Sequence, residues 1–193
     1  MVGKNKFEWN DHWRLNGKHA LLSPSGYHWL NYDDEKMQNV YLNNLRKEKG
    51  TRLHALASEM INLGIDPTNT RSCLVQFVLD AIGLGMESEK VLYYSDNVFG
   101  TADAIKYDEE TNTLLVFDLK TGTSKPSFNQ LLIYSAIFCL EYGFKPEKMS
   151  FLLRLYQGRG FKELEPEGKD VRECMKQIVA MDAVINKLKN EGY

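Results

Sequence analysis

The chain has 193 residues, of which 43% are hydrophobic and 26% are charged, and its formal net charge is −2. This length and composition are typical of a single globular domain, and the balance of charge excludes a generally basic nucleic-acid coat while leaving room for a local basic groove. No window of about 18 apolar residues is present and the polar N-terminal sequence has no apolar signal region, so we expect neither a membrane partner nor secretion.

The N-terminal part is expected to pass from a polar arm into helices. Residues 1–22 combine aromatic and basic side chains without a clear period, which favours either an arm that contacts a nucleic acid strand or a terminus held down by its tryptophans. Ser23 followed by Pro24 is typical of a helix start, with Ser as the N-cap and Pro at the first helical position. Apolar residues continue at helical spacing over 34–47, until Gly50 interrupts the pattern.

Two more helices complete the first half of the chain. Residues 51–63 have an apolar stripe at helical spacing, and so do residues 67–85, whose N-terminus Asn69 or Thr70 would cap. The whole region over 23–85 is therefore predicted to be helical.

The period changes from helical to extended after residue 90. Strands are predicted over 91–94, 98–107 and 113–120, joined by a turn at 96–97 and a hairpin loop over 108–112. The third strand, TLLVFDLK, has a continuous apolar run instead of an alternating pattern. We therefore expect it to be buried on both faces, in the middle of a sheet covered by helices.

The remaining residues return to helices around further strands. A helix is predicted over 126–142, a strand over 149–156, a short edge strand over 161–164 and an amphipathic helix over 169–189. This order of elements predicts an α/β fold with a central mixed β-sheet flanked by helices. We expect the whole chain to form one domain.

Two charged side chains lie at the end of the apolar strand over 113–120. Asp118 and Lys120 are two residues apart, so they project from the same face of the strand, and burying them is costly unless they pair with each other or bind a metal. An ion pair at the rim of the sheet is one explanation. Asp103 on the neighbouring strand offers another, because carboxylates on adjacent strands can share Mg²⁺ or Mn²⁺. Alone, Asp103 would be interpreted as a turn or capping residue.

These residues belong to a series of short motifs. The motifs are residues 22–25 (LSPS), 50–54 (GTRLH), 100–103 (GTAD), 118–120 (DLK) and 130–134 (QLLIY). In this order they resemble the RecB-type exonuclease branch of the PD-(D/E)XK nuclease superfamily, whose signatures are GxxxH, GxxD, (D/E)xK and QxxxY. The LSPS start resembles that of phage-encoded members. The resemblance implies a restriction-endonuclease-like core.

The resemblance also implies a metal centre that holds Mg²⁺ or Mn²⁺. Its ligands would be the side chains of His54, Asp103 and Asp118 and the main-chain carbonyl of Leu119, while Lys120 would position the nucleophile or stabilise the transition state. Taken without the resemblance, a lone histidine at the position of His54 is typical of a satisfied core or surface residue.

Gln130 and Tyr134 are four residues apart and therefore share one face of the predicted helix over 126–142. The resemblance implies that this face lines the active site and places the DNA strand. Without the resemblance, the two residues would be interpreted as a polar surface pair.

DNA binding would depend on local basic side chains, because the net charge is close to zero. The candidates near the predicted site and on the following strand and turn are Arg52, Lys125, Arg154 and Arg159. They can neutralise phosphates along a groove. The alternative is that they are ordinary solvated charges.

The cysteines set this chain apart from some relatives in the same branch, which hold an iron–sulfur cluster with four cysteines. This chain has only three cysteines, and they lie outside the positions expected for cluster ligands: Cys73, Cys139 and Cys174. We therefore predict no iron–sulfur cluster. They form no CxxC motif, which favours neither a zinc site nor a disulfide framework. The expected location is a reducing cytoplasm, that of a bacterial host if the protein is phage-encoded.

The function that these patterns favour is a metal-dependent DNA nuclease. We expect an exonuclease or a single-strand or flap nuclease of phage or mobile-element replication, recombination or repair, which acts on DNA with or without a recombination or replication partner protein. The competing hypothesis is a non-catalytic or partner-activated DNA-binding or assembly protein on the same fold, because a fold alone does not determine activity.

Overall fold

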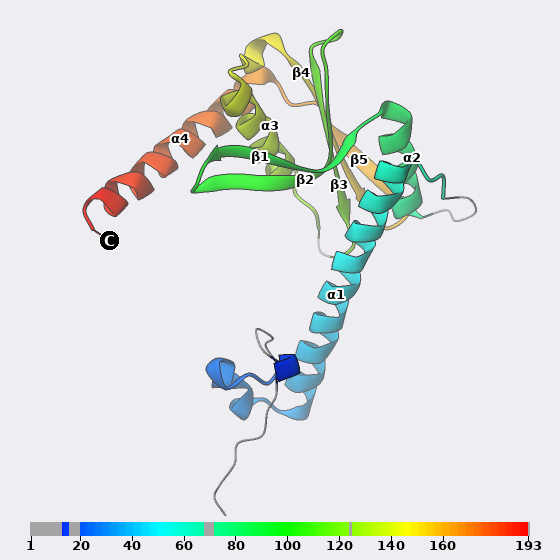
Figure 1. The fold of residues 1–193 in the computed structure, drawn as a ribbon, viewed down its shortest axis with the longest axis vertical. Helices are drawn as coiled ribbons and strands as arrows, with labels where there is room; N and C mark the ends of the chain where they lie inside the picture. Colours follow the sequence, from blue (N-terminus) through cyan, green and yellow to red (C-terminus); the bar gives the residue numbers. More distant parts are fainter. Residues whose placement is uncertain (1–12, 16–19, 68–71, 124, 193) are drawn as a thin grey trace, which may run out of the picture. The chain divides into compact units, whose positions relative to one another are not determined.

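The computed structural model describes residues 13–15, 20–67, 72–123 and 125–192 (Figure 1). The chain divides into two compact units, Met1–Lys47 and Glu48–Tyr193. The sequence predicts one domain and no boundary here, and the division falls inside one long helix, α1 (Asp34–Leu63). The predicted catalytic elements all lie in the second unit.

The first unit contains short 3₁₀ helices, η1 (Trp13–Leu15) and η2 (Pro24–Asn31), and the start of α1. The predicted helix start at Ser23-Pro24 is present, but it begins a 3₁₀ helix and the Ser23 side chain makes no capping hydrogen bond. Instead the Ser23 carbonyl accepts hydrogen bonds from the Gly26 amide and the Trp29 indole, each at 3.0 Å. Most of the predicted arm, residues 1–12 and 16–19, lies outside the described residues.

Helix α1 is continuous where the sequence predicts a break at Gly50. Gly50 is buried inside the helix, and a Cβ atom at this position would lie 2.7 Å from the Thr121 hydroxyl. The glycine therefore allows the helix to approach the loop after strand β3 (Thr113–Lys120) closely. Its low helix propensity does not end the helix. The prediction of two separate helices is wrong for this tertiary reason.

Helix α2 (Cys73–Leu84) is shorter than predicted, and its N-cap is Ser72, whose hydroxyl accepts a hydrogen bond from the Val75 amide at 3.3 Å. The predicted caps, Asn69 and Thr70, lie outside the described residues. Helices α3 (Asn129–Tyr142) and α4 (Gly168–Asn190) begin within about a turn of their predicted positions. Within the described residues, no helix combines the length and the apolar character needed to cross a bilayer.

The five strands form one sheet in the order β1-β2-β3-β4-β5. Besides β3, they are β1 (Glu87–Ser95), β2 (Val98–Asp108), β4 (Ser150–Gln157) and β5 (Gly160–Leu164). Strands β3 and β4 pair in parallel and the other neighbours pair antiparallel, so the predicted mixed sheet is confirmed. The predicted burial of β3 on both faces is also confirmed, because its residues from Leu114 to Leu119 are all buried.

Helices cover both faces of this sheet and give the second unit three layers (Figure 1). Leu114 and Val116 of β3 pack in one core with residues of α3 and α4. Leu115, Phe117 and Leu119 of the same strand pack in a second core with residues of α1 and α2. The alternation of β3 side chains thus divides its apolar residues between two cores, and it directs Asp118 and Lys120 to the α3 side.

Candidate functional site

Strands β2 and β3 separate at Asp103, and this fork creates the candidate site. Their pairing runs from Asp108↔Thr113 to Ala104↔Phe117. Beyond that pair, a side chain replaces the backbone as the acceptor, because Asp103 Oδ2 accepts a hydrogen bond from the Leu119 amide at 2.8 Å. Ala102 and Ala104 pack in opposite cores although they are only two residues apart, so β2 changes direction at Asp103. A carboxylate is thereby fixed at the end of the paired region.

His54 meets Asp103 at this fork. Its Nδ1 lies 3.2 Å from Asp103 Oδ2, and the two side chains are 30% and 16% exposed. The hydrogen bond to Asp103 raises the pKa of His54 against the opposing effect of burial, and the charges of Asp103, Asp118 and Glu89 add to the rise. A histidine from α1 and an aspartate from β2, which are far apart in the sequence, thus form one polar pair.

Asp118 and Lys120 form the ion pair that the sequence suggested as one explanation for them. Asp118 is only 3% exposed, and Lys120 Nζ lies 3.1 Å from its Oδ1 and 2.9 Å from its Oδ2. The contact to Oδ2 has an ion-pair distance without hydrogen-bond geometry, so this buried oxygen accepts no hydrogen bond. Burial raises the pKa of Asp118, with repulsion from Asp103 adding to the rise and Lys120 opposing it. The carboxylate is therefore incompletely stabilised in its ionised form.

Gln130 and Tyr134 connect Lys120 to strand β2. The Lys120 ammonium donates to Gln130 Oε1 at 2.6 Å, Gln130 Nε2 donates to the Tyr134 hydroxyl at 3.2 Å, and that hydroxyl donates to the Thr101 carbonyl at 2.6 Å. Gly100 lets the tyrosine ring approach, since a Cβ atom there would lie 3.0 Å from Tyr134 Cε1. The two residues are more than a polar surface pair, because they fix the position of the lysine.

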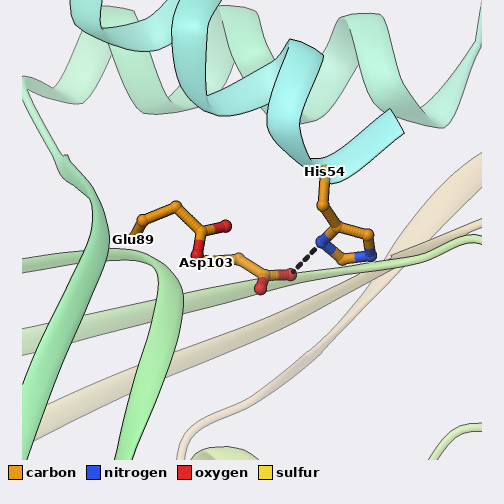
Figure 2. A group of neighbouring side chains, drawn as sticks. All are labelled: His54, Glu89 and Asp103. Carbon is orange, nitrogen blue, oxygen red and sulfur yellow. Dashed lines mark ion pairs between the residues drawn. The ribbon is translucent and has the colours of Figure 1, made fainter. Parts of the chain in front are cut away.

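Sequence analysis did not identify Glu89, which the structure places beside His54 and Asp103 (Figure 2). Ser88 pairs with Ala104 and Lys90 with Ala102, so Glu89 lies opposite Asp103 on the neighbouring strand. Burial raises the pKa of Glu89 and repulsion from Asp103 raises it further, against attraction to His54. The predicted strand begins at residue 91, so Glu89 lies outside it.

The donor set of the fork fits a divalent cation. One ligand atom each from His54, Glu89 and Asp103 lie within 4.8 Å of one another, and two ligands on opposite sides of Mg²⁺ are roughly 4 Å apart. Asp118 is not part of this compact group; its carboxylate contacts Lys120 at the same end of β3, and its buried Oδ2 accepts no hydrogen bond. The carbonyl of Leu119 stays a predicted ligand.

The basic side chains proposed for DNA binding differ in their surroundings. Arg154 lies on the opposite face of the sheet from Asp118, with its guanidinium carbon 4.6 Å and 4.3 Å from the ring centroids of Phe117 and Phe161. It also pairs with Asp80 at 2.7 Å and with Glu163, so its charge is already neutralised inside the protein. The structure therefore gives Arg154 a packing role in place of the expected phosphate contact.

The other basic candidates are exposed and stay predictions. Arg52 lies on α1 and Arg159 lies in the turn between β4 and β5. Lys125 lines a cavity of about 320 Å³ together with Lys120, Ser127, Gln130 and Gln157. This cavity is next to the Asp118–Lys120 pair and offers two ammonium groups to an anion.

The cysteines lie apart from this fork. Cys139 is buried, and burial raises the pKa of its thiol to about 12. Cys73 and Cys174 are half-buried, and all three thiols are free. The three cysteines therefore pack as small apolar side chains do.

Comparison of the chain with protein-family models, curated proteins and solved structures finds no match.

Proposed function

We propose that the protein is a metal-dependent nuclease that hydrolyses phosphodiester bonds in DNA, as an exonuclease or a single-strand or flap nuclease of phage or mobile-element replication, recombination or repair. The observation that carries this proposal is the convergence of a buried carboxylate, a positioned lysine and a His–Asp pair at one fork of the sheet. The resemblance of the motifs to RecB-type nucleases names the same residues independently of their positions in space.

The metal site would consist of His54, Asp103 and Asp118, which would hold Mg²⁺ or Mn²⁺. When bound, the ion supplies charge neutralisation at the phosphate and lowers the pKa of a water molecule. Asp103 is held in place by the Leu119 amide, and the lack of a hydrogen bond at Asp118 Oδ2 leaves that oxygen able to accept a cation. Such fixed orientation of the ligands is what a metal site requires from its surroundings.

Lys120 is the proposed electrostatic catalyst of the reaction. Its ammonium is held between Asp118 and Gln130, and it borders the cavity that Lys125 also lines. A phosphate in this cavity would meet a positive charge whose position does not change during the reaction, and such preorganised charge stabilises the charge that develops on the phosphate oxygens. Gln130 and Tyr134 act as positioning residues for the lysine.

The test is cleavage of end-labelled single-stranded, duplex and flapped DNA in Mn²⁺, Mg²⁺ or EDTA. Asp118→Asn keeps the shape of the side chain but removes its charge, so we expect it to lose cleavage while its circular dichroism stays that of the wild type. Lys120→Ala should lose rate and keep most of its metal affinity. Glu109→Ala, in the exposed hairpin loop, is the matched control and should cleave normally.

Two results would contradict the proposal. Equal cleavage by purified Asp118→Asn and wild type would show that this carboxylate does not serve the reaction. No cleavage of any substrate by the wild type, with DNA binding retained, would favour the partner-activated or assembly protein on the same fold.

A further inference from the structure

Glu89 faces Asp103 across two neighbouring antiparallel strands. Directly opposite residues of such a pair lie on the same face with their Cβ atoms about 5 Å apart, and like charges there are destabilising. Glu89 also has a left-handed backbone conformation, with φ of 51°, which is uncommon for a residue other than glycine. The fold thus holds a second carboxylate beside the first in an arrangement that neither electrostatics nor backbone preference favours.

The neighbouring Glu87 shows how a glutamate on this strand is otherwise accommodated. Its carboxylate pairs with Lys90 Nζ at 2.6 Å, which offsets its charge. Among the described residues, the attraction that acts on the charge of Glu89 comes from His54, which is already paired with Asp103. Glu89 is exposed, so its carboxylate is accessible to an ion from the solvent.

Asp118 adds an independent indication that a cation belongs here. Its Oδ2 is buried and accepts no hydrogen bond, and its charge is close enough to His54 and Asp103 to interact with both. Lys120 Nζ lies 2.9 Å from this oxygen, and a bound cation would give the oxygen the further partner that it lacks.

We propose that Glu89 is a protein ligand of the divalent cation, together with His54 and Asp103, from which a ligand atom each lies within 4.8 Å of the others (Figure 2). This inference rests on the metal site of the proposed function and adds to it a ligand that none of the sequence motifs contains. Because Glu89 comes from β1, the cation would connect α1, β1 and β2, and Asp118 of β3 would stay the ligand that the proposed function assigns to it.

The experiment is a titration of the metal-free full-length protein with Mn²⁺, followed by isothermal calorimetry and by the electron paramagnetic resonance of free Mn²⁺. Glu89→Gln removes the charge and keeps the size of the side chain and the strain of the backbone. Its Mn²⁺ affinity should fall about tenfold or more, because even the loss of a residue that only hydrogen-bonds a metal ligand has an effect of this size. Glu87→Gln, on the same strand, is the matched control and should bind Mn²⁺ as the wild type does.

A thermal melt separates a metal ligand from a residue with only a structural role. Without metal, Glu89→Gln should melt at a higher temperature than the wild type, because it removes the repulsion from Asp103. With Mn²⁺ the order should reverse, since the variant gains less from the ion. A structural role predicts the opposite, with a lower melting temperature in both conditions and unchanged Mn²⁺ affinity.

The outcomes distinguish this inference from the proposed function. Failure of the wild type to bind Mn²⁺ would overturn the metal site and this inference with it. Equal Mn²⁺ binding by wild type and Glu89→Gln would overturn the role of Glu89 alone. If Glu89→Gln does not fold, Glu89→Asp keeps the charge on a shorter side chain, and affinity equal to that of the wild type would contradict direct coordination, because the shorter carboxylate would be displaced from the ion.

Discussion

The close approach of helix α1 to the loop after β3 makes Gly50 the most informative position for mutation. Gly50→Ala has two opposing effects on stability. Alanine gains about 1 kcal/mol of helix propensity, but its Cβ would lie 2.7 Å from the Thr121 hydroxyl, and such overpacking costs about 1–3 kcal/mol. We therefore expect the single variant to lose between about 0 and 2 kcal/mol of unfolding free energy.

Removing the Thr121 hydroxyl should reverse the sign of the same substitution. Thr121 is exposed, so Thr121→Ala alone should change stability by no more than about 0.5 kcal/mol. In that background the new Cβ has space, because the remaining Thr121 atom near it is 3.8 Å away. Gly50→Ala should then stabilise the protein by about 1 kcal/mol, which gives a coupling energy of about 1–3 kcal/mol between the two positions.

Urea unfolding of the two single variants and the double variant measures this coupling. Gly83→Ala is the control, because Gly83 also lies inside a helix but has open space around its Cβ position, so this change should stabilise by up to about 1 kcal/mol. If Gly50→Ala stabilises as much as the control and shows no coupling to Thr121, the helix does not approach the loop as described. The position of His54, one turn further along the same helix, would then lose its explanation.

Three further predictions concern residues outside the metal site. Tyr134→Phe removes a hydroxyl that bridges α3 and β2, so we expect a loss of about 1 kcal/mol in urea unfolding and a lower cleavage rate. Arg154→Ala should lower stability by on the order of 2 kcal/mol, because its charge-assisted hydrogen bonds are lost. It should leave the salt dependence of DNA binding unchanged. Lys125→Ala should leave stability unchanged and lower the slope of log affinity against log salt concentration by about 1. The Arg172 guanidinium holds the pKa of Glu147 at about 2, below its ordinary value of 4.5. The stabilisation from this pair is therefore complete above pH 4.5 and is lost as the pH falls toward 2, so the melting temperatures of wild type and Glu147→Gln should converge over that range; a constant difference would contradict the assignment.

The central strand and its charged end could be predicted from the sequence because the required information is local. A continuous apolar run indicates a strand buried on both faces, and two charges within such a run indicate either an ion pair or a metal site. The break predicted at Gly50 failed because helix propensity is a local quantity, whereas the reason for the glycine is the hydroxyl of Thr121, a residue in a distant loop. The surroundings of Arg154 could not be predicted for the same reason, since its partner Asp80 lies on another element.

The register of the β1–β2 hairpin explains why Glu89 could not be found in the same way. Ser95 pairs with Val98, but Tyr93 pairs with Phe99, so an irregularity between these pairs shifts the register by one residue. Without that shift Lys90 would lie opposite Asp103, and an ordinary cross-strand ion pair would result. Because a shift of one residue moves every side chain to the other face, the bulge converts a salt bridge into two facing carboxylates. Bulges of this kind occur next to active sites, where they redirect a side chain, and the facing carboxylates that result here are the arrangement that a divalent cation would stabilise.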